Sequence, residues 1–322
     1  MAECLVCATT SPGSAFLHGF LLFPRLVLLA CFSLWASWCS AQTVALTFDD
    51  GLNPGKQPEA VQWNAQLLDA LRNQGIQSAL FPSLIRIGGA EGLALVAEWS
   101  RAGHSVGNHT ANHRSLADSQ VSLAAFIADV ETADAALRNM PTFVPMLRFP
   151  YLKEGDTPAK RDGMRVWMTK NGYRSAPVSI DASDWYYSRV YADHMKAGQT
   201  AKAQGVKQRY IRHLLDRAAY YDGLARQVLG RSPKHVMLLH TNQLNADALP
   251  DVIAALTAQG WTIAAANAAF EDPLYAQAPD NLPAGESIVW ALAKAGNLPG
   301  LRYPAEDSTY EEPLLRDAGL LP

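Results

Sequence analysis

Hydrophobic and polar positions follow two alternating patterns between residues 44 and 264. Short apolar runs, as in buried strands, are followed by longer stretches with apolar residues three and four apart, as in helices packed on one face. The predicted strands are 44–48, 76–81, 104–106, 143–147, 174–178, 235–239 and 261–264, and the clearest helices are 59–73, 93–101 and 123–137. This alternation predicts an α/β fold with a parallel sheet.

Two later stretches do not follow this alternation. Residues 186–234 separate two predicted strands, and the part from 206 to 229 has helical spacing and many charges. Because this segment is longer than a simple crossover requires, we interpret it as a helical insertion in a domain that spans 42–270. Residues 271–322 are rich in proline and acidic side chains, and we expect them to pack on the domain as a tail.

The first 41 residues have the pattern of an export signal. An uncharged apolar run at 26–38 follows Arg25, and the small residues Cys39-Ser40-Ala41 come next. We therefore expect cleavage after Ala41 and a secreted or periplasmic protein with no stable membrane span after processing. Two alternatives remain open. One is an uncleaved anchor, although the run is shorter than the ~20 residues of a spanning helix. The other is a lipid-bearing Cys31.

The composition excludes some classes of protein and of chemistry. With 27 basic and 30 acidic residues, the formal net charge is −3, so we expect no nucleic-acid partner. All four cysteines lie at or before position 39. The rest of the chain therefore uses no disulfide, thiolate ligand or cysteine nucleophile.

Polar residues stand at the ends of the predicted strands. Asp49 and Asp50 directly follow the first strand. Carboxyl ends of parallel strands face a common site, and adjacent carboxylates repel each other unless a cation compensates. Asp-Asp-Gly is also an ordinary turn sequence. These residues alone leave both interpretations open.

A histidine pair adds the possibility of a metal site. His109 and His113 are four residues apart, a spacing that lets two imidazoles meet at one ion. An isolated pair of this kind is often a coincidence, and a site needs a third ligand, which Asp50 could supply. Such a set leaves metal positions open to water and substrate, as in hydrolytic sites.

Other predicted strands also end in residues that can carry chemistry. Together with the groups above, they place carboxylate, imidazole and guanidinium side chains at five successive strand ends. The additional residues are Arg148, Asp181, Asp184, Trp185 and His240. Each has an ordinary explanation alone, but the combination indicates a shared site.

These strand ends resemble, in order, five motifs of the NodB-type polysaccharide deacetylases, which form carbohydrate esterase family 4. The segments are Thr47-Phe48-Asp49-Asp50-Gly51, His109-Thr110-Ala111-Asn112-His113, Arg148-Phe149-Pro150-Tyr151, Asp181-Ala182-Ser183-Asp184-Trp185 and Leu238-Leu239-His240. Leu152 replaces a frequent glycine, and Thr241 stands where an acidic residue is common. These departures concern the shape of the groove and fine tuning rather than a catalytic group.

The resemblance implies a distorted (β/α) barrel of about seven strands and one divalent metal ion, most often Zn²⁺. It assigns Asp49 as base, His240 as acid, and Asp50, His109 and His113 as metal ligands. It further pairs Arg148 with the base and Asp181 with the acid. The Tyr151 backbone N–H is expected to hydrogen-bond the oxyanion, and Trp185 and Leu238 are expected to form the walls of the acetyl pocket.

The expected function is therefore metal-dependent removal of acetyl groups from an N-acetylated or O-acetylated polysaccharide or peptidoglycan. A small-molecule amidohydrolase on the same scaffold is one alternative, which the export signal and an expected open groove disfavour. A glycan-binding module without catalysis is another, and the acid and base residues argue against it. The sequence leaves open the glycan, the metal and the oligomeric state.

Overall fold

The computed structural model describes residues 42–302 and 308–321, so the predicted signal at 1–41 lies outside the described residues. The strands are β1 (Thr43–Asp50), β2 (Ala79–Pro82), β3 (Ser105–Asn108), β4 (Phe143–Leu147), β5 (Lys153–Gly155), β6 (Arg174–Ser175), β7 (Lys234–His240), β8 (Thr262–Ile263) and β9 (Ala284–Gly285). The helices are α1 (Ala60–Asn73), α2 (Leu84–Ile87), α3 (Ala90–Arg101), α4 (Leu123–Leu137), α5 (Pro158–Lys170), α6 (Asp184–Lys196), α7 (Thr200–Leu229), α8 (Gln243–Ala258), α9 (Ala266–Phe270), α10 (Ile288–Ala295) and α11 (Ser308–Asp317). Two 3₁₀ turns, η1 (Pro150–Leu152) and η2 (Pro273–Ala276), complete the elements.

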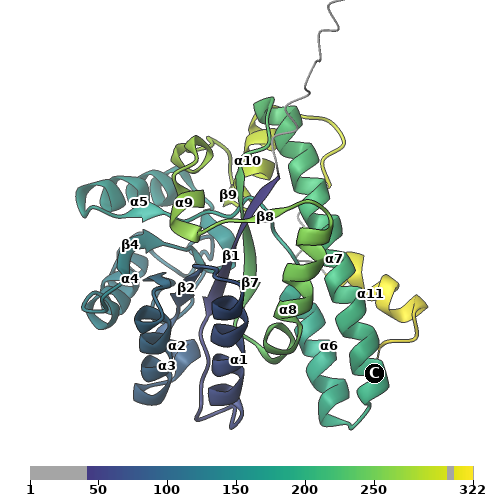
Figure 1. Cartoon of the computed structure of the whole chain (residues 1–322). Coiled ribbons are helices and arrows are strands. Elements are labelled where there is room, and N and C mark those ends of the chain that lie inside the picture. The colour runs from purple at the N-terminus through teal and green to yellow at the C-terminus, as the bar shows by residue number, and fades with distance from the viewer. Residues whose placement is uncertain (1–41, 303–307, 322) are drawn as a thin grey trace, which may run out of the picture. The chain divides into compact units, whose positions relative to one another are not determined.

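A seven-stranded sheet carries the fold (Figure 1). Its order is β6-β4-β3-β2-β1-β7, β8 also pairs with β1, and every pair in it is parallel. In the β1–β7 register, Asp49 lies opposite His240. The central pair of strands therefore delivers two predicted site residues to the same edge of the sheet.

The two ends of the strand path come together without forming a full strand pair. A bridge joins Ile180, which follows β6, to Met237 of β7, and the Leu238 N–H donates to the Ile180 carbonyl at 3.0 Å. The curled parallel sheet with its helices confirms the prediction of a distorted (β/α) barrel of about seven strands.

Strand β1 has a nearly continuous apolar sequence because both of its faces are buried. Val44, Leu46 and Phe48 are fully buried, and so are Ala45 and Thr47 between them. Strands of parallel sheets are covered on both faces, so both sets of alternating positions are shielded from water. Phe48 packs against Trp99 of α3 with ring centroids 5.3 Å apart, which ties a covering helix to the sheet.

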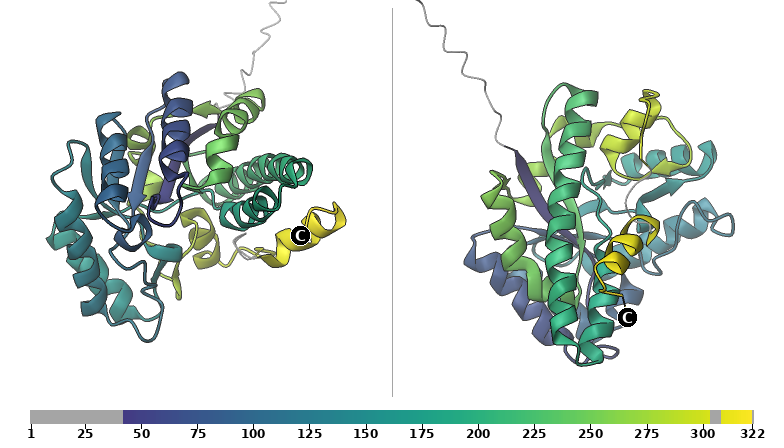
Figure 2. Two further views of the ribbon diagram at one scale, coloured as in Figure 1. Left: turned by 90° about the horizontal axis from the view of Figure 1, so that it is seen from below. Right: turned by 90° about the vertical axis from the view of Figure 1, so that its right-hand side faces the viewer.

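The stretch 186–234 is occupied mainly by α6 and α7, which lie side by side in both views (Figures 1 and 2). Buried aromatic residues, including Tyr187 and Tyr210, pack between them with ring centroids 5.8 Å apart. Helix α7 ends at Gly230, whose φ of 70° suits a glycine cap. The first residue of α6 is Asp184, so this helix pair begins at the end of the sheet that carries the site.

Residues after 271 contribute to the fold through β9, α10 and α11. Strand β9 pairs antiparallel with β5, and the Glu286 N–H donates to the Leu152 carbonyl at 2.9 Å. The tail therefore contacts the segment that directly follows Arg148 and Tyr151. None of the helices in the described part of the chain combines the length and apolarity needed to cross a membrane.

Candidate active site

A cleft of about 1220 Å³ opens at the carboxyl ends of the strands. Eight of the ten predicted site residues line it: Asp49, Asp50, His109, His113, Tyr151, Trp185, Leu238 and His240. Arg148 and Asp181 do not line it and are fully buried. The cleft is therefore the candidate active site.

Three potential metal ligands converge on one side of the cleft. One ligand atom from each of Asp50, His109 and His113 lies within 4.8 Å of the others. Nε2 of His113 is 3.1 Å from Nε2 of His109 and 3.3 Å from Oδ1 of Asp50. The backbone at Asp50 and His113 has positive φ values of 79° and 53°, and such strain gathers at functional sites.

The protonation of the two histidines suits a cation. Burial lowers the pKa of His109 to about 4 and that of His113 to about 3, so both rings are neutral at pH 7. Nδ1 of His109 lies 2.7 Å from the Arg148 carbonyl and donates its proton there, which leaves Nε2 as the lone-pair nitrogen. Two imidazole nitrogens and a carboxylate oxygen facing one another fit a divalent metal ion.

Arg86 is a neighbour of these ligands that no sequence motif marks. Its Nε is 3.6 Å from Oδ1 of Asp50, and its Nη2 is 3.3 Å from Nδ1 of His113. A guanidinium has no acceptor, so it cannot receive a proton from that ring nitrogen. Arg86 reaches this place from α2, just after β2.

The predicted base, Asp49, is held by Arg148. Nη1 of Arg148 donates to Oδ1 of Asp49 at 3.0 Å, and its Nη2 donates to the Thr47 hydroxyl at 3.2 Å. Burial raises the pKa of Asp49 to about 6, although the charge of Arg148 opposes this rise. Asp49 is therefore mostly ionised at pH 7 and is a stronger base than an ordinary aspartate.

The predicted acid, His240, is held by Asp184. Nδ1 of His240 lies 2.6 Å from Oδ1 of Asp184, and the His240 backbone N–H donates to Oδ2 at 2.7 Å. Burial alone would lower the pKa of His240, but the charge and hydrogen bond of Asp184, with the charges of Asp50 and Asp49, raise it to about 10. The ring is therefore an imidazolium at pH 7 that can donate a proton from Nε2.

The prediction that Asp181 partners His240 is wrong. Asp184 takes this place because it begins α6 opposite the end of β7, where Asn245 also donates to its Oδ2 at 2.9 Å. Asp181 lies three residues earlier, and both of its buried carboxylate oxygens lack a hydrogen-bond partner. The two aspartates occupy one motif, and only the position of the helix start distinguishes them.

The remaining predicted residues lie along the same cleft. Tyr151 has a left-handed backbone, with φ 57°, and its ring contacts the His113 ring with centroids 4.7 Å apart. The Trp185 side chain is partly exposed and Leu238 is buried, and both line the cleft. An apolar wall is thus available beside the metal ligands.

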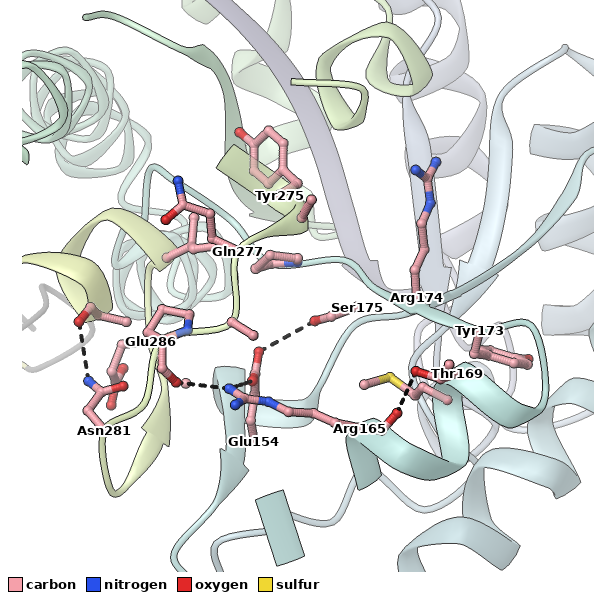
Figure 3. Close-up of a pocket in the computed structure, with 18 residues that line it drawn as sticks. Glu154, Arg165, Thr169, Tyr173, Arg174, Ser175, Tyr275, Gln277, Asn281 and Glu286 are labelled. Carbon is pink, nitrogen blue, oxygen red and sulfur yellow. Dashed lines mark hydrogen bonds and ion pairs between the residues drawn. The ribbon is translucent and has the colours of Figure 1, made fainter. Parts of the chain in front are cut away.

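A second pocket, of about 280 Å³, lies between α5 and the tail (Figure 3). At its centre, Glu154 accepts from the Ser175 hydroxyl at 3.4 Å and forms an ion pair with Arg165 at 3.7 Å. Arg165 also donates to the Pro279 carbonyl at 3.0 Å. None of the predicted site residues lines this pocket, and its Arg165 connects α5 to the tail.

The comparisons with known families agree with the motif analysis. Residues 39–167 match the model of the family described as polysaccharide deacetylase. The matched segment contains Asp49, the three metal-binding candidates and Arg148. The predicted resemblance is thereby confirmed. No curated protein matches the chain.

The solved structures that the chain resembles include two described as members of carbohydrate esterase family 4. A mutant of BA3943, described as a family 4 carbohydrate esterase pseudoenzyme with restored enzymatic activity, is 16% identical over 71% of this chain and 68% of that one, with a TM-score of 0.50. A family 4 carbohydrate esterase from Streptomyces lividans in complex with acetate is 22% identical over 69% and 91% of the two chains, with a TM-score of 0.45. At this level of identity, the first likeness shows a shared fold.

Proposed function

We propose that the protein removes acetyl groups from an N-acetylated or O-acetylated polysaccharide or peptidoglycan, because its residues 39–167 match the family model described as polysaccharide deacetylase. The observation that carries the proposal is that one cleft contains both a group that can accept a proton and a group that can donate one. Asp49 is a buried carboxylate held by Arg148, and His240 is an imidazolium held by Asp184. The metal-binding candidates line the same cleft.

Asp50, His109 and His113 would hold one divalent ion, and we propose Zn²⁺ because imidazole and carboxylate ligands suit it. When bound, such an ion polarises the acetyl carbonyl and lowers the pKa of a water molecule. The three residues provide the ligands, and the His109 contact with the Arg148 carbonyl fixes which ring nitrogen faces the ion.

Asp49 would accept a proton from the attacking water, as a general base does. Arg148 stabilises the ionised form of Asp49 before the reaction and remains charged throughout. As the carbon–nitrogen or carbon–oxygen bond breaks, His240 would donate its Nε2 proton to the departing amine or alcohol. The products are acetate and the free sugar amine or hydroxyl.

The Tyr151 backbone N–H would donate to the oxyanion that forms at the acetyl carbonyl. Trp185 and Leu238 would enclose the methyl group, since both contribute apolar surface to the same cleft. The cleft volume of about 1220 Å³ exceeds the ~300–1,000 Å³ of ordinary small-molecule pockets, which supports a glycan over a small amide.

We further propose export from the cytoplasm, based on the apolar run and small residues before Ala41. The expected mature N-terminus is Gln42, and N-terminal sequencing of the exported protein measures it. A lipid-modified chain beginning at Cys31 would instead support the lipoprotein alternative, and retention of residues 1–41 would support the anchor.

The test of the proposed function is acetate release from a panel of chitin oligomers, peptidoglycan, acetylated xylan and exopolysaccharide. We expect release from at least one, loss of release with a chelator, and recovery with added zinc. His113→Ala leaves two ligands, so it should lose both bound metal and activity. Absence of acetate release from every substrate by metal-loaded protein would favour a binding module, and release only from small N-acetyl compounds would favour an amidohydrolase.

A further inference from the structure

Cationic side chains surround the candidate active site. Four of them line the cleft, namely Lys56, Arg86, Lys153 and Arg189. Among the described residues that line it, the acidic ones are Asp49 and Asp50, and both belong to the reaction centre. Since the whole chain has a net charge of −3, this excess of positive charge is a local feature of the cleft.

The cations come from separate parts of the fold. Lys56 lies in the loop between β1 and α1, Arg86 lies on α2, Lys153 lies on β5, and Arg189 lies on α6. The fold therefore brings charge to the cleft from segments that are far apart in the sequence.

Two of these side chains have no acidic counterpart in the described part of the chain. The ion pairs there include Arg86 with Asp50 and Lys153 with Glu286, whereas none involves Lys56 or Arg189. The guanidinium of Arg189 lies over the Tyr186 ring, 5.0 Å from its centroid, and 5.8 Å from that of Trp185. Arg189 is therefore held beside the predicted acetyl pocket with its charge uncompensated.

A cleft lined by cationic side chains favours glycans of one charge over glycans of another. Cations lining a cleft attract anions and repel other cations. A carboxylate on a neighbouring sugar would find paired N–H donors in Arg189 and a point charge in Lys56. A free sugar ammonium, which is the product of N-deacetylation, would be repelled by the same groups.

We propose that the substrate is an acetylated glycan with carboxylate groups on the sugars next to the acetylated one, bound by Lys56 and Arg189. This inference rests on the proposed function for the acetyl chemistry, but it concerns a separate property, which is the charge of the bound polymer. The carboxylate can belong to a uronic acid or to the lactyl ether of a muramic acid.

Binding without turnover tests the charge preference independently of catalysis. The full metal-loaded chain is titrated with hexagalacturonate and with neutral cellohexaose, neither of which carries an acetyl group. We expect tighter binding of the anionic sugar, with a preference that declines between 0.05 and about 1 M salt as the Debye length falls to ~3 Å.

The double variant K56Q/R189Q identifies the groups responsible. We expect it to lose about 3- to 30-fold in affinity for hexagalacturonate, as exposed charge pairs contribute, with cellohexaose unaffected. K170Q/K202Q is the matched control, because it changes the net charge equally by substituting lysines that do not line the cleft. R189K keeps the positive charge, so it should retain part of the affinity that R189Q loses. This comparison distinguishes the effect of the lost charge from the effect of disturbed packing on Tyr186.

Acetate release then distinguishes the source of the carboxylate. Oligosaccharides of N-acetylglucosamine with glucuronate and fragments with muramic acid are compared with chitohexaose. Equal binding of the charged and neutral hexasaccharides, or equal loss in both double variants, overturns the inference. Charge-selective binding with no acetate released from any substrate supports the inference and overturns the proposed function instead.

Discussion

At the residue scale, the contact between Asp184 and His240 makes the strongest prediction. Asp184→Asn removes the charge that keeps His240 protonated, so we expect kcat/KM on an N-acetyl glycan to fall by about 10²–10⁴, the usual worth of general acid catalysis. An acetyl ester, whose leaving group needs less protonation, should be less affected. Parallel kinetics on both substrates measure this difference.

Asp181→Asn is the matched control for that experiment, since Asp181 has no hydrogen bond to His240. We expect it to keep most of the activity, and it retains the size of the side chain. If Asp181→Asn removed the amide activity while Asp184→Asn preserved it, the assignment of the partner would have to be reversed.

A second prediction at this scale concerns Arg86 and metal affinity. A metal-bound histidine normally donates its other ring N–H to an acceptor, and the Arg86 guanidinium next to Nδ1 of His113 offers none. Arg86→Gln provides a carbonyl and removes a positive charge near the proposed metal site. We expect zinc to bind about 10-fold tighter, in keeping with the 10–100-fold effects of such neighbours.

Competition with a chromophoric chelator gives the zinc affinity directly. Arg101→Gln on α3, which does not line the cleft, controls for the change in net charge. Unchanged or weaker zinc binding by the Arg86 variant would show that this arginine supports the metal ligands rather than opposing them.

Much of the site is visible in the sequence because its chemistry is concentrated in short segments. Asp49, Asp50, His109 and His113 have other interpretations when each pair is taken alone, and they become recognisable as site residues once the five strand-end motifs are taken in order. Arg86 is not, because an isolated arginine after a strand looks like any surface cation. The choice between Asp181 and Asp184 depends on where a helix begins, which residue type alone does not determine.

At the scale of elements, the β5–β9 pair supports the loop that carries Tyr151. Gly285 has a φ of 119°, and an added Cβ would lie 1.8 Å from the Leu152 carbonyl oxygen. Gly285→Ala should therefore displace this loop, lower the free energy of unfolding by about 1–3 kcal/mol, and reduce kcat/KM. Urea unfolding and steady-state kinetics measure the two effects.

Gly172→Ala is a suitable control, because Gly172 also has a positive φ, of 68°, but has open space around its Cα. It should destabilise the fold by about 1 kcal/mol without affecting kcat/KM. A Gly285→Ala variant with normal kcat/KM would show that β9 does not determine the geometry of the site.

Long apolar strands and regular helices are the elements that the sequence predicts well. The helix at 123–137 has the predicted bounds, whereas the predicted strand at 174–178 is reduced to Arg174–Ser175. Strands β5 and β9 were not predicted. They have three and two residues, too few for a period to be detected. Their pairing arises from contacts across the fold rather than from local preference.

At the scale of the whole molecule, two buried carboxylates make stability depend on pH. Burial opposes ionisation of Glu311, but the hydrogen bonds and charge of His213 and the Tyr187 hydroxyl lower its pKa below the usual value. Asp222 behaves in the same way through His235, Ser232 and Arg226. Both groups bind protons more readily when unfolded, so they stabilise the fold above about pH 4.5 and lose this effect as the pH falls further.

Urea unfolding at pH 7 and pH 3.5 should therefore show lower stability in acid. Glu311→Gln should lose about 1–3 kcal/mol at pH 7, where it removes a charged hydrogen-bond acceptor, and less at pH 3.5. Glu312→Gln, the adjacent residue with an exposed partner in Arg316, should change little at either pH. An equal loss at both pH values for Glu311→Gln would exclude ionisation as the cause.

The pairing of β1 with β7 affects the order in which the parts of the candidate active site come together during folding. The metal-binding candidates lie at the end of β1 and just after β3, and these two strands, with β2 between them, are neighbours in sequence as well as in the sheet. His240 reaches them only when β7 pairs with β1, a contact that the Thr47–Met237 hydrogen bond makes across 190 positions. Closing so long a loop is entropically costly and slow. During folding, the chain can thus bring its three metal-binding candidates together before His240, the proposed proton donor, joins them.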